Sequence, residues 1–117
     1  MSMVKALPAA RSGRAILILH NGLGHSVAVT HALAATKEAR GSVPNLLSAP
    51  IPLKPDESRT VDVSDELSKL FNPLDKARQE KRIRIRLALE PEPPQPQRAS
   101  QYSVTFQEGQ FTEFSAP

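Results

Sequence analysis

The chain of 117 residues contains no cysteine and no tryptophan, and its only aromatic residues are four phenylalanines and one tyrosine. Without cysteine there is no disulfide, no thiol nucleophile and no thiolate ligand for zinc. So few aromatic side chains also disfavour the stacking of bases that single-strand binding proteins commonly use. A core must therefore be aliphatic, and a chain of this length has enough residues to build one as a single domain.

Long hydrophobic runs are also missing. The longest purely apolar run, Ala15–Leu19, is far too short to cross a bilayer. Residues 1–10 contain a lysine but no apolar stretch of the kind that signal peptides have. The sequence predicts no membrane contact, and a location in the cytoplasm or inside a particle assembled there.

Charge is unevenly distributed, although the net charge is only +3. Residues 54–75 carry six acidic and three basic groups, whereas residues 76–98 carry seven basic and three acidic groups. Blocks of opposite sign indicate one or two interaction surfaces rather than a protein that coats a polyanion over its whole surface.

The basic block contains the clearest pattern in the chain. From Arg82 to Leu89 basic and apolar residues alternate, with Arg82, Arg84 and Arg86 on one side and isoleucine or leucine on the other. A period of two predicts a strand with one face on a core and one in solvent. The side chains predicted to contact nucleic-acid phosphates are Lys76, Arg78, Lys81, Arg82, Arg84 and Arg86. Two other interpretations remain open: the arginines protect an edge strand from pairing with other chains, or they pair with the acidic block.

A second candidate is the glycine-containing turn after Ala15–Leu19, which is predicted to be a strand buried on both faces. Ser26 is a good N-cap for a helix over residues 26–40, and the first turn of a helix attracts anions. Phosphate or nucleotide binding at this turn would use Gly22, Gly24, His25 and Ser26. The turn lacks the third glycine and the later carboxylate of a dinucleotide-binding motif, so no cofactor is predicted.

No catalytic or metal-binding residues are predicted. The three histidines, His20, His25 and His31, are five and six residues apart, which does not match the spacing of metal ligands on one helix face. The chain shows no paired carboxylates placed for hydrolysis, and we expect a protein that is not an enzyme.

The remaining chain divides into four predicted parts. Residues 1–14 are expected to be a flexible arm, residues 15–90 an α/β core domain and residues 91–98 a proline-rich linker. Residues 99–117 are expected to form a β-hairpin that turns at Glu108-Gly109 and docks on the core or on a partner. The core would also contain a strand at residues 59–63 and a helical segment at residues 64–81, kinked at Pro73.

These elements predict a small α+β fold, in which a mixed sheet of four to five strands carries two or three helices on one face. Because such an open sheet leaves unpaired edges, a homodimer is expected. The predicted function is non-enzymatic binding of RNA or DNA backbone through the arginine-lined strand. The alternative is an assembly subunit of a larger complex, such as a phage or viral particle, that contacts a protein partner through Pro91–Arg98 or the C-terminal hairpin. Nucleotide binding at Gly22 and Gly24 is the third possibility.

Overall fold

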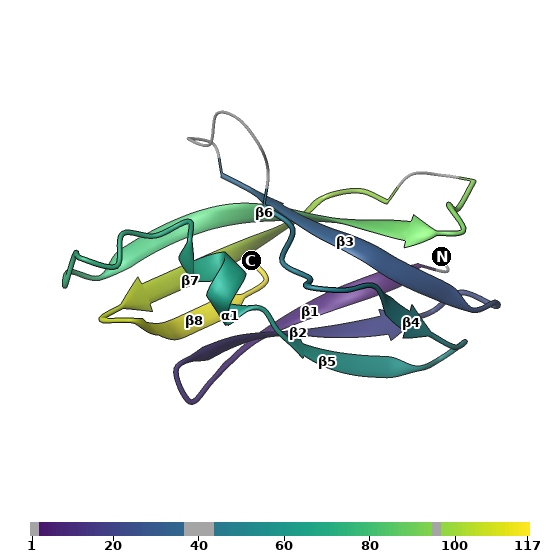
Figure 1. The fold of residues 1–117 in the computed structure, drawn as a ribbon, viewed down its shortest axis with the longest axis horizontal. Coiled ribbons are helices and arrows are strands. Elements are labelled where there is room, and N and C mark those ends of the chain that lie inside the picture. Colours follow the sequence, from purple (N-terminus) through teal and green to yellow (C-terminus); the bar gives the residue numbers. More distant parts are fainter. Residues whose placement is uncertain (1–2, 37–43, 95–96) are drawn as a thin grey trace.

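The computed structural model describes residues 3–36, 44–94 and 97–117. Its strands are β1 (Val4–Arg11), β2 (Arg14–Asn21), β3 (Val27–Ala35), β4 (Ile51–Leu53), β5 (Ser58–Asp62), β6 (Gln79–Glu90), β7 (Ser100–Gln107) and β8 (Gln110–Ser115). The one helix within these ranges, α1, is the short segment Ser64–Ser68. Two antiparallel sheets pack face to face, one in the order β1-β2-β5 and the other in the order β4-β3-β6-β7-β8 (Figure 1).

The predicted α+β fold with helices on one face of a mixed sheet is therefore wrong: the described chain is a β-sandwich. The expected strands at residues 15–19, 59–63 and 82–90 are present as β2, β5 and β6. The expected helices account for the error, because residues 27–35 form β3 and residues 69–81 contain no helix. Residues 37–40 of the first predicted helix lie outside the described residues.

β3 looked like a helix because its inward-facing positions are not evenly spaced. A β-bulge between Val29 and His31 shifts the register by one residue, so the buried positions are 27, 29, 32 and 34. The extra residue inserts a step of three into a period of two, and alanine, the best helix former, fills several of these positions. Pairing with strands on both sides then overrides local propensity.

The predicted helical segment over residues 64–81 ends early. Of the apolar residues in this segment, Leu67 and Phe71 are buried, but Leu74 is 89% exposed. After α1 the chain makes tight turns, and the loop before β6 is held by Asn72, whose backbone groups bond to the side chain of Gln79. Pro73 follows directly, where a helix could not continue without losing a hydrogen bond.

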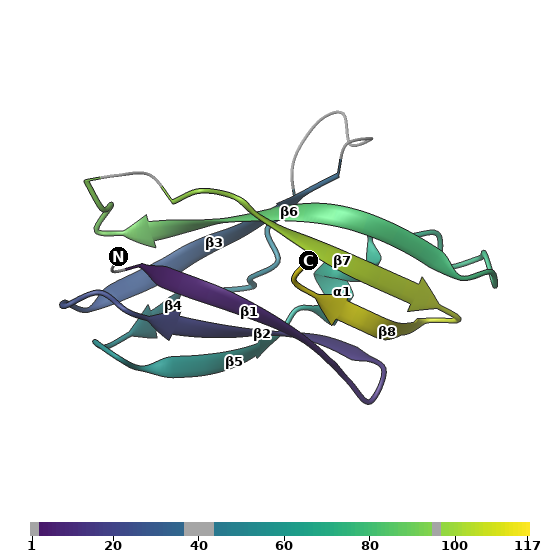
Figure 2. The ribbon, with the colours of Figure 1, turned by 180° about the vertical axis from the view of Figure 1, so that it is seen from behind.

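Residues 1–14 do not form the expected arm, because Val4–Arg11 is an edge strand of the first sheet. Figure 2 shows β1 running beside β2. Pro8 is tolerated there because Ala6, two residues earlier, directs its carbonyl away from β2, toward the hydroxyl of Tyr102 (2.8 Å). The alternation of backbone direction places the nitrogen of Pro8 on that same unpaired side, where no ladder hydrogen bond is lost.

Two hairpins complete the sheets, and both turn through two residues with positive φ, as type I′ turns require. Ser12 and Gly13 (φ 51° and 77°) join β1 to β2, and Glu108 and Gly109 (φ 51° and 79°) join β7 to β8. The C-terminal hairpin was predicted at this turn, and it adds to β6 as part of the second sheet. The amide of Phe111 donates to the carbonyl of Gly13 (2.8 Å), so the curled second sheet reaches the first along this side.

The core between the sheets is aliphatic along most of its length and aromatic at one end. Phe71, Phe106 and Phe111 stack with ring centroids 4.9–6.0 Å apart, and Tyr102 contacts Phe114 at 5.7 Å. Burial raises the pKa of the Tyr102 hydroxyl, which is therefore a stable neutral donor to β1. The C-terminal aromatics thus hold the sandwich together.

The crossing between the sheets depends on Asn21, which is fully buried at the end of β2. Its side-chain amide donates to the carbonyls of His25, Leu53 and Lys54 (2.9–3.1 Å), and its side-chain oxygen accepts from the amide of Leu23 (2.8 Å). The carbonyls of His25 and Lys54 lie in the connections that leave and re-enter the first sheet, and that of Leu53 lies at the end of β4. One buried side chain therefore bonds to the backbone of three segments, and its bond to Leu53 is fully buried.

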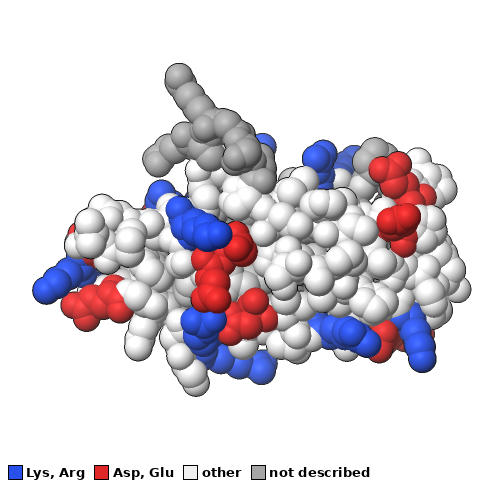
Figure 3. Space-filling view, viewed as in Figure 1, with Lys and Arg blue, Asp and Glu red and all other residues white. Residues whose placement is uncertain are grey.

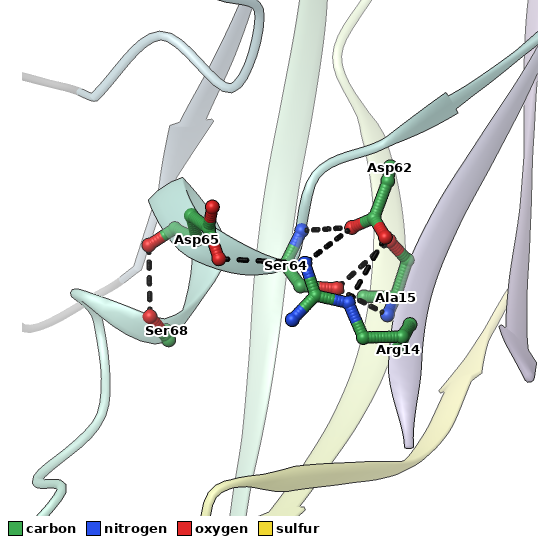
Figure 4. A network of polar contacts seen from close by, with 6 residues as sticks. All are labelled: Arg14, Ala15, Asp62, Ser64, Asp65 and Ser68. Atoms are coloured by element: carbon green, nitrogen blue, oxygen red, sulfur yellow. Dashed lines mark hydrogen bonds and ion pairs between the residues drawn. The ribbon is translucent and has the colours of Figure 1, made fainter. Parts of the chain in front are cut away.

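A second polar network joins β2, β5 and α1 (Figure 4). The Arg14 guanidinium donates to Asp62 (2.9 Å) and to Asp65 (3.4 Å), while the Asp62 carboxylate accepts from the amide of Ser64 (2.9 Å). Ser64, the first residue of α1, is buried, and its hydroxyl accepts from the amide of Ala15 (2.8 Å). Partial desolvation raises the pKa of Asp62, but the bonds from Arg14 and Ser64 outweigh it, so the pKa lies below its ordinary value.

Replacing Asn21 by alanine is expected to destabilise the protein by about 3 kcal/mol, because buried carbonyl groups lose their donor. Urea unfolding followed by circular dichroism measures the change. The control is Asn72→Ala, which removes an exposed bond to the amide of Leu74 and should cost less than about 1 kcal/mol. Similar losses in the two variants would show that the Asn21 carboxamide has no special structural role.

Replacing Asp62 by asparagine is expected to change how the free energy of unfolding depends on pH in the acid range. Because the pKa of Asp62 is lower in the folded state than in the unfolded state, where it is about 4, the carboxylate stabilises the fold at pH values above 4. This stabilisation is lost as the pH falls through the pKa of the folded state. Since both partners are about half exposed, we expect a loss below about 1 kcal/mol at pH 7 that disappears once the pH has fallen below the folded pKa. Glu92→Gln, at an exposed residue, controls for net charge, and a gap that persists at low pH would contradict the assignment.

Candidate nucleic-acid interface

The alternation predicted for β6 is present in the structure. Ile83, Ile85, Leu87 and Leu89 are buried against the first sheet. Arg82, Arg84 and Arg86 are exposed on the opposite, outer face of the second sheet, and we call these three residues the arginine stripe.

The arginine stripe lies on the central strand of the sheet, not on an edge. β6 pairs with β3 on one side and with β7 on the other. An edge strand uses charged side chains to block pairing with another chain. Arg84 pairs with a strand on each side and does not need this protection, whereas Arg82 pairs only with β7 and Arg86 only with β3. The interpretation of the arginines as edge protection is therefore wrong for Arg84 and remains a prediction for Arg82 and Arg86.

The neighbours of the stripe across the sheet are uncharged. Arg84 lies opposite Ala35 of β3 and Gln101 of β7, and Arg86 and Arg82 lie opposite Leu33 and Ser103. These short or neutral side chains surround the guanidinium groups without supplying a counter-charge. On β6 itself the stripe lies between Glu80, which pairs with Arg78, and Glu90.

The acidic block does not neutralise the stripe either. Four of its six carboxylates pair elsewhere, in the ion pairs Arg14–Asp62, Arg14–Asp65, Arg59–Glu57 and Lys69–Glu66. Figure 3 shows basic and acidic side chains side by side over α1 and the adjoining strand ends. Among the described residues, none forms an ion pair or a side-chain hydrogen bond with Arg82, Arg84 or Arg86.

The spacing of the stripe makes its three charges act together. Alternate residues of an antiparallel strand are about 6.8 Å apart, so the stripe is about 14 Å long. The distance of about 6.8 Å between neighbouring arginines is below the Debye length of about 8 Å at physiological ionic strength, so each arginine repels the next. A regularly charged polyanion relieves that repulsion and releases its own counterions.

A hollow of about 480 Å³ adjoins the stripe where β3 ends. Its lining is of mixed charge: Ala35, Thr36, Glu80, Lys81, Arg82, Ile83, Arg84 and Gln101. The pattern of residues 100–106 predicted a strand but not its position beside β6, so the sequence did not identify Gln101 as part of this surface.

The other predicted phosphate contacts are not part of the stripe. Lys81 points toward the interior, where its ammonium group donates to the carbonyl of Leu70 (2.7 Å) and lies 5.5 Å from the ring centre of Phe71. Arg78 pairs with Glu80 at 2.7 Å, and Lys76 is exposed in the loop before β6. The structure therefore separates Lys81 from the three arginines.

The glycine-containing turn does not have the geometry predicted for it. Residues 22–26 connect β2 to β3, so the helix N-terminus that would attract a phosphate does not exist. The amides of Gly22 and Leu23 already donate to the carbonyl of Met3 (2.9 Å) and to the side chain of Asn21 (2.8 Å). A Cβ on Gly22 would lie 2.7 Å from the Met3 carbonyl oxygen, so close packing accounts for this glycine. His25 and Ser26 are exposed in the same turn.

The described residues contain no cluster of three or more histidine or acidic side chains able to hold a metal ion. Within the same residues no helix is long and apolar enough to cross a membrane. Comparisons with protein-family models, with curated proteins and with solved structures found no match to this chain. The function must therefore be argued from the surface itself.

Because Lys81 points toward the interior and Arg84 points to solvent, their replacement should change stability by different amounts. Lys81→Gln should destabilise the fold by about 1–2 kcal/mol, because it removes a charge-assisted hydrogen bond and a cation–π contact. Arg84→Gln should change stability by less than about 0.5 kcal/mol, since its side chain is exposed. Urea titration of both variants measures the difference, and equal losses would refute the assignment of Lys81 to the interior.

Proposed function

We propose that the protein binds the sugar–phosphate backbone of RNA or DNA through Arg82, Arg84 and Arg86, and that it acts by binding rather than by catalysis. The observation that carries this proposal is the position of three exposed arginines on a central strand, without a carboxylate partner among the described residues. A guanidinium group can hold a phosphate through two parallel hydrogen bonds. Backbone pairing with β7 at Arg82, with β3 at Arg86 and with both strands at Arg84 supports a fixed spacing of the three groups.

The surface supports backbone contact better than recognition of bases. Its uncharged neighbours are aliphatic, amide or hydroxyl side chains, and all five aromatic residues are buried in the core. Without an exposed phenylalanine or tyrosine ring, the platform on which single-strand binding proteins commonly stack bases is missing. Binding is therefore expected to depend strongly on salt and weakly on sequence.

Fluorescence anisotropy with labelled single-stranded RNA and DNA over a salt series tests the proposal. Three phosphate contacts predict that log K falls with log salt with a slope of about −2 for a single strand. The variant Arg82→Gln, Arg84→Gln, Arg86→Gln should bind at least about tenfold more weakly at low salt and show a smaller slope, because its phosphate contacts are lost.

The matched control removes the same number of charges from other exposed positions, as Lys54→Gln, Lys69→Gln, Arg98→Gln. It should retain the affinity of the unmodified protein within about twofold if contacts rather than net charge decide binding. Absence of binding at low salt, or an equal loss in the control variant, would refute the arginine stripe as a nucleic-acid interface.

A further inference from the structure

The outer face of the other sheet, β1-β2-β5, carries a group of unpaired apolar side chains. Cross-strand pairing sets Leu7 opposite Ile18 and Ala9 opposite Ile16. We call these four residues the apolar patch. Figure 2 shows the three strands of this sheet side by side.

The patch faces away from the core. The inward positions of the same strands hold Val4, Leu17 and Leu19, which are at most 2% exposed. By contrast, Leu7 is 51% exposed and the other patch residues are only half-buried. The continuous apolar run of β2 is typical of a strand covered on both faces, yet the described residues cover only one of them.

Basic side chains stand at both ends of the patch. Lys5 and His20 are paired at one end, and Arg11 and Arg14 at the other. Arg14 is held by Asp62, whereas Lys5 and Arg11 are exposed and have no ion pair with any other described residue. Lys5 and Arg11 are six positions apart on β1, so about 20 Å of strand lies between these two free cations.

These features define the chemistry of what covers the patch. A flat apolar centre packs well against the apolar face of another protein sheet, and the free cations at its ends require carboxylates. We infer that the apolar patch docks an acidic protein surface, with an apolar centre between carboxylates about 20 Å apart. This inference does not rest on nucleic-acid binding, because the arginine stripe lies on the other sheet.

Two other occupants fit less well. A second copy of the chain would bring together two faces that each carry Lys5, Arg11 and Arg14 against the single acid Asp62, and like charges across an interface disfavour that partner. A nucleic acid would place phosphates and bases against aliphatic side chains that offer neither hydrogen bonds nor stacking.

The chain itself supplies a defined probe for this docking. The variant Lys5→Glu, Arg11→Glu keeps the apolar centre but presents carboxylates at both ends, and so has the chemistry inferred for the partner. Mixed at equal concentration with a chain that keeps Lys5 and Arg11, it should form a one-to-one complex in sedimentation velocity. The dissociation constant should be at least tenfold lower than for self-association of either chain.

Both chains in this experiment also carry the three glutamine replacements of the arginine stripe, so that the stripe cannot capture the new carboxylates. Failure of docking is then distinguishable from failure of nucleic-acid binding. Ile18→Ser in both chains should weaken the complex at least tenfold, because it removes the apolar contact. Leu74→Ser, at an exposed leucine far from the patch in the loop before β6, is the matched control and should leave the complex intact.

Four results would overturn the inference. Absence of a complex would exclude docking of the stated chemistry, and a complex insensitive to Ile18→Ser would show attraction by charge alone. A homodimer of the unmodified chain that Ile18→Ser dissociates would make a second copy the occupant. Binding of the unmodified chain to phosphatidylcholine–phosphatidylserine vesicles, lost in Ile18→Ser, would make an anionic membrane the occupant.

Discussion

The bonds of the buried Asn21 carboxamide are the constraint on which the arrangement of the two sheets depends. The chain leaves the first sheet after β2 and re-enters it at β5, and Asn21 bonds to the backbone of both connections. Its bond to the Leu53 carbonyl is buried, so removal of the side chain leaves that carbonyl without a donor, while the bonds to His25 and Lys54 are partly buried. The connection after β2 and the connection before β5 are therefore both bonded to Asn21. This contact helps to fix the two sheets relative to each other, with their outer faces directed away from one another.

Local pattern predicted the parts of this fold in which side chains alternate without interruption. β5 and β6 were recognised in this way. β2 was recognised from its continuous apolar run, and the hairpin of β7 and β8 from its turn at Glu108-Gly109. β3 was missed because its bulge breaks the period of two. β1 was missed because Pro8 argues against a strand unless its nitrogen lies on the unpaired side, and that depends on which neighbour the strand acquires.

The candidate site, like the fold, could be predicted from the sequence only in part. Alternation identified which face of β6 carries Arg82, Arg84 and Arg86, but it gave no information on whether that strand is central or at an edge. That distinction arises from pairing between residues far apart in the chain, such as Arg84 with Ala35 and Gln101. Lys81 was assigned to the basic surface by proximity in sequence, whereas the strand period places it on the opposite face, near Phe71.

The two outer faces differ in the ligand chemistry that would satisfy them, and this difference follows from what lies between the charges. In the arginine stripe the cations are adjacent and their neighbours are uncharged, so a ligand must supply closely spaced negative charge. In the apolar patch the free cations are about 20 Å apart and separated by Leu7, Ile16 and Ile18, so a ligand must supply apolar area first and charge only at its ends. A single buried core supports both faces. Under the two proposals the sandwich therefore presents, on opposite sides of that core, two surfaces that differ in the class of partner they would bind.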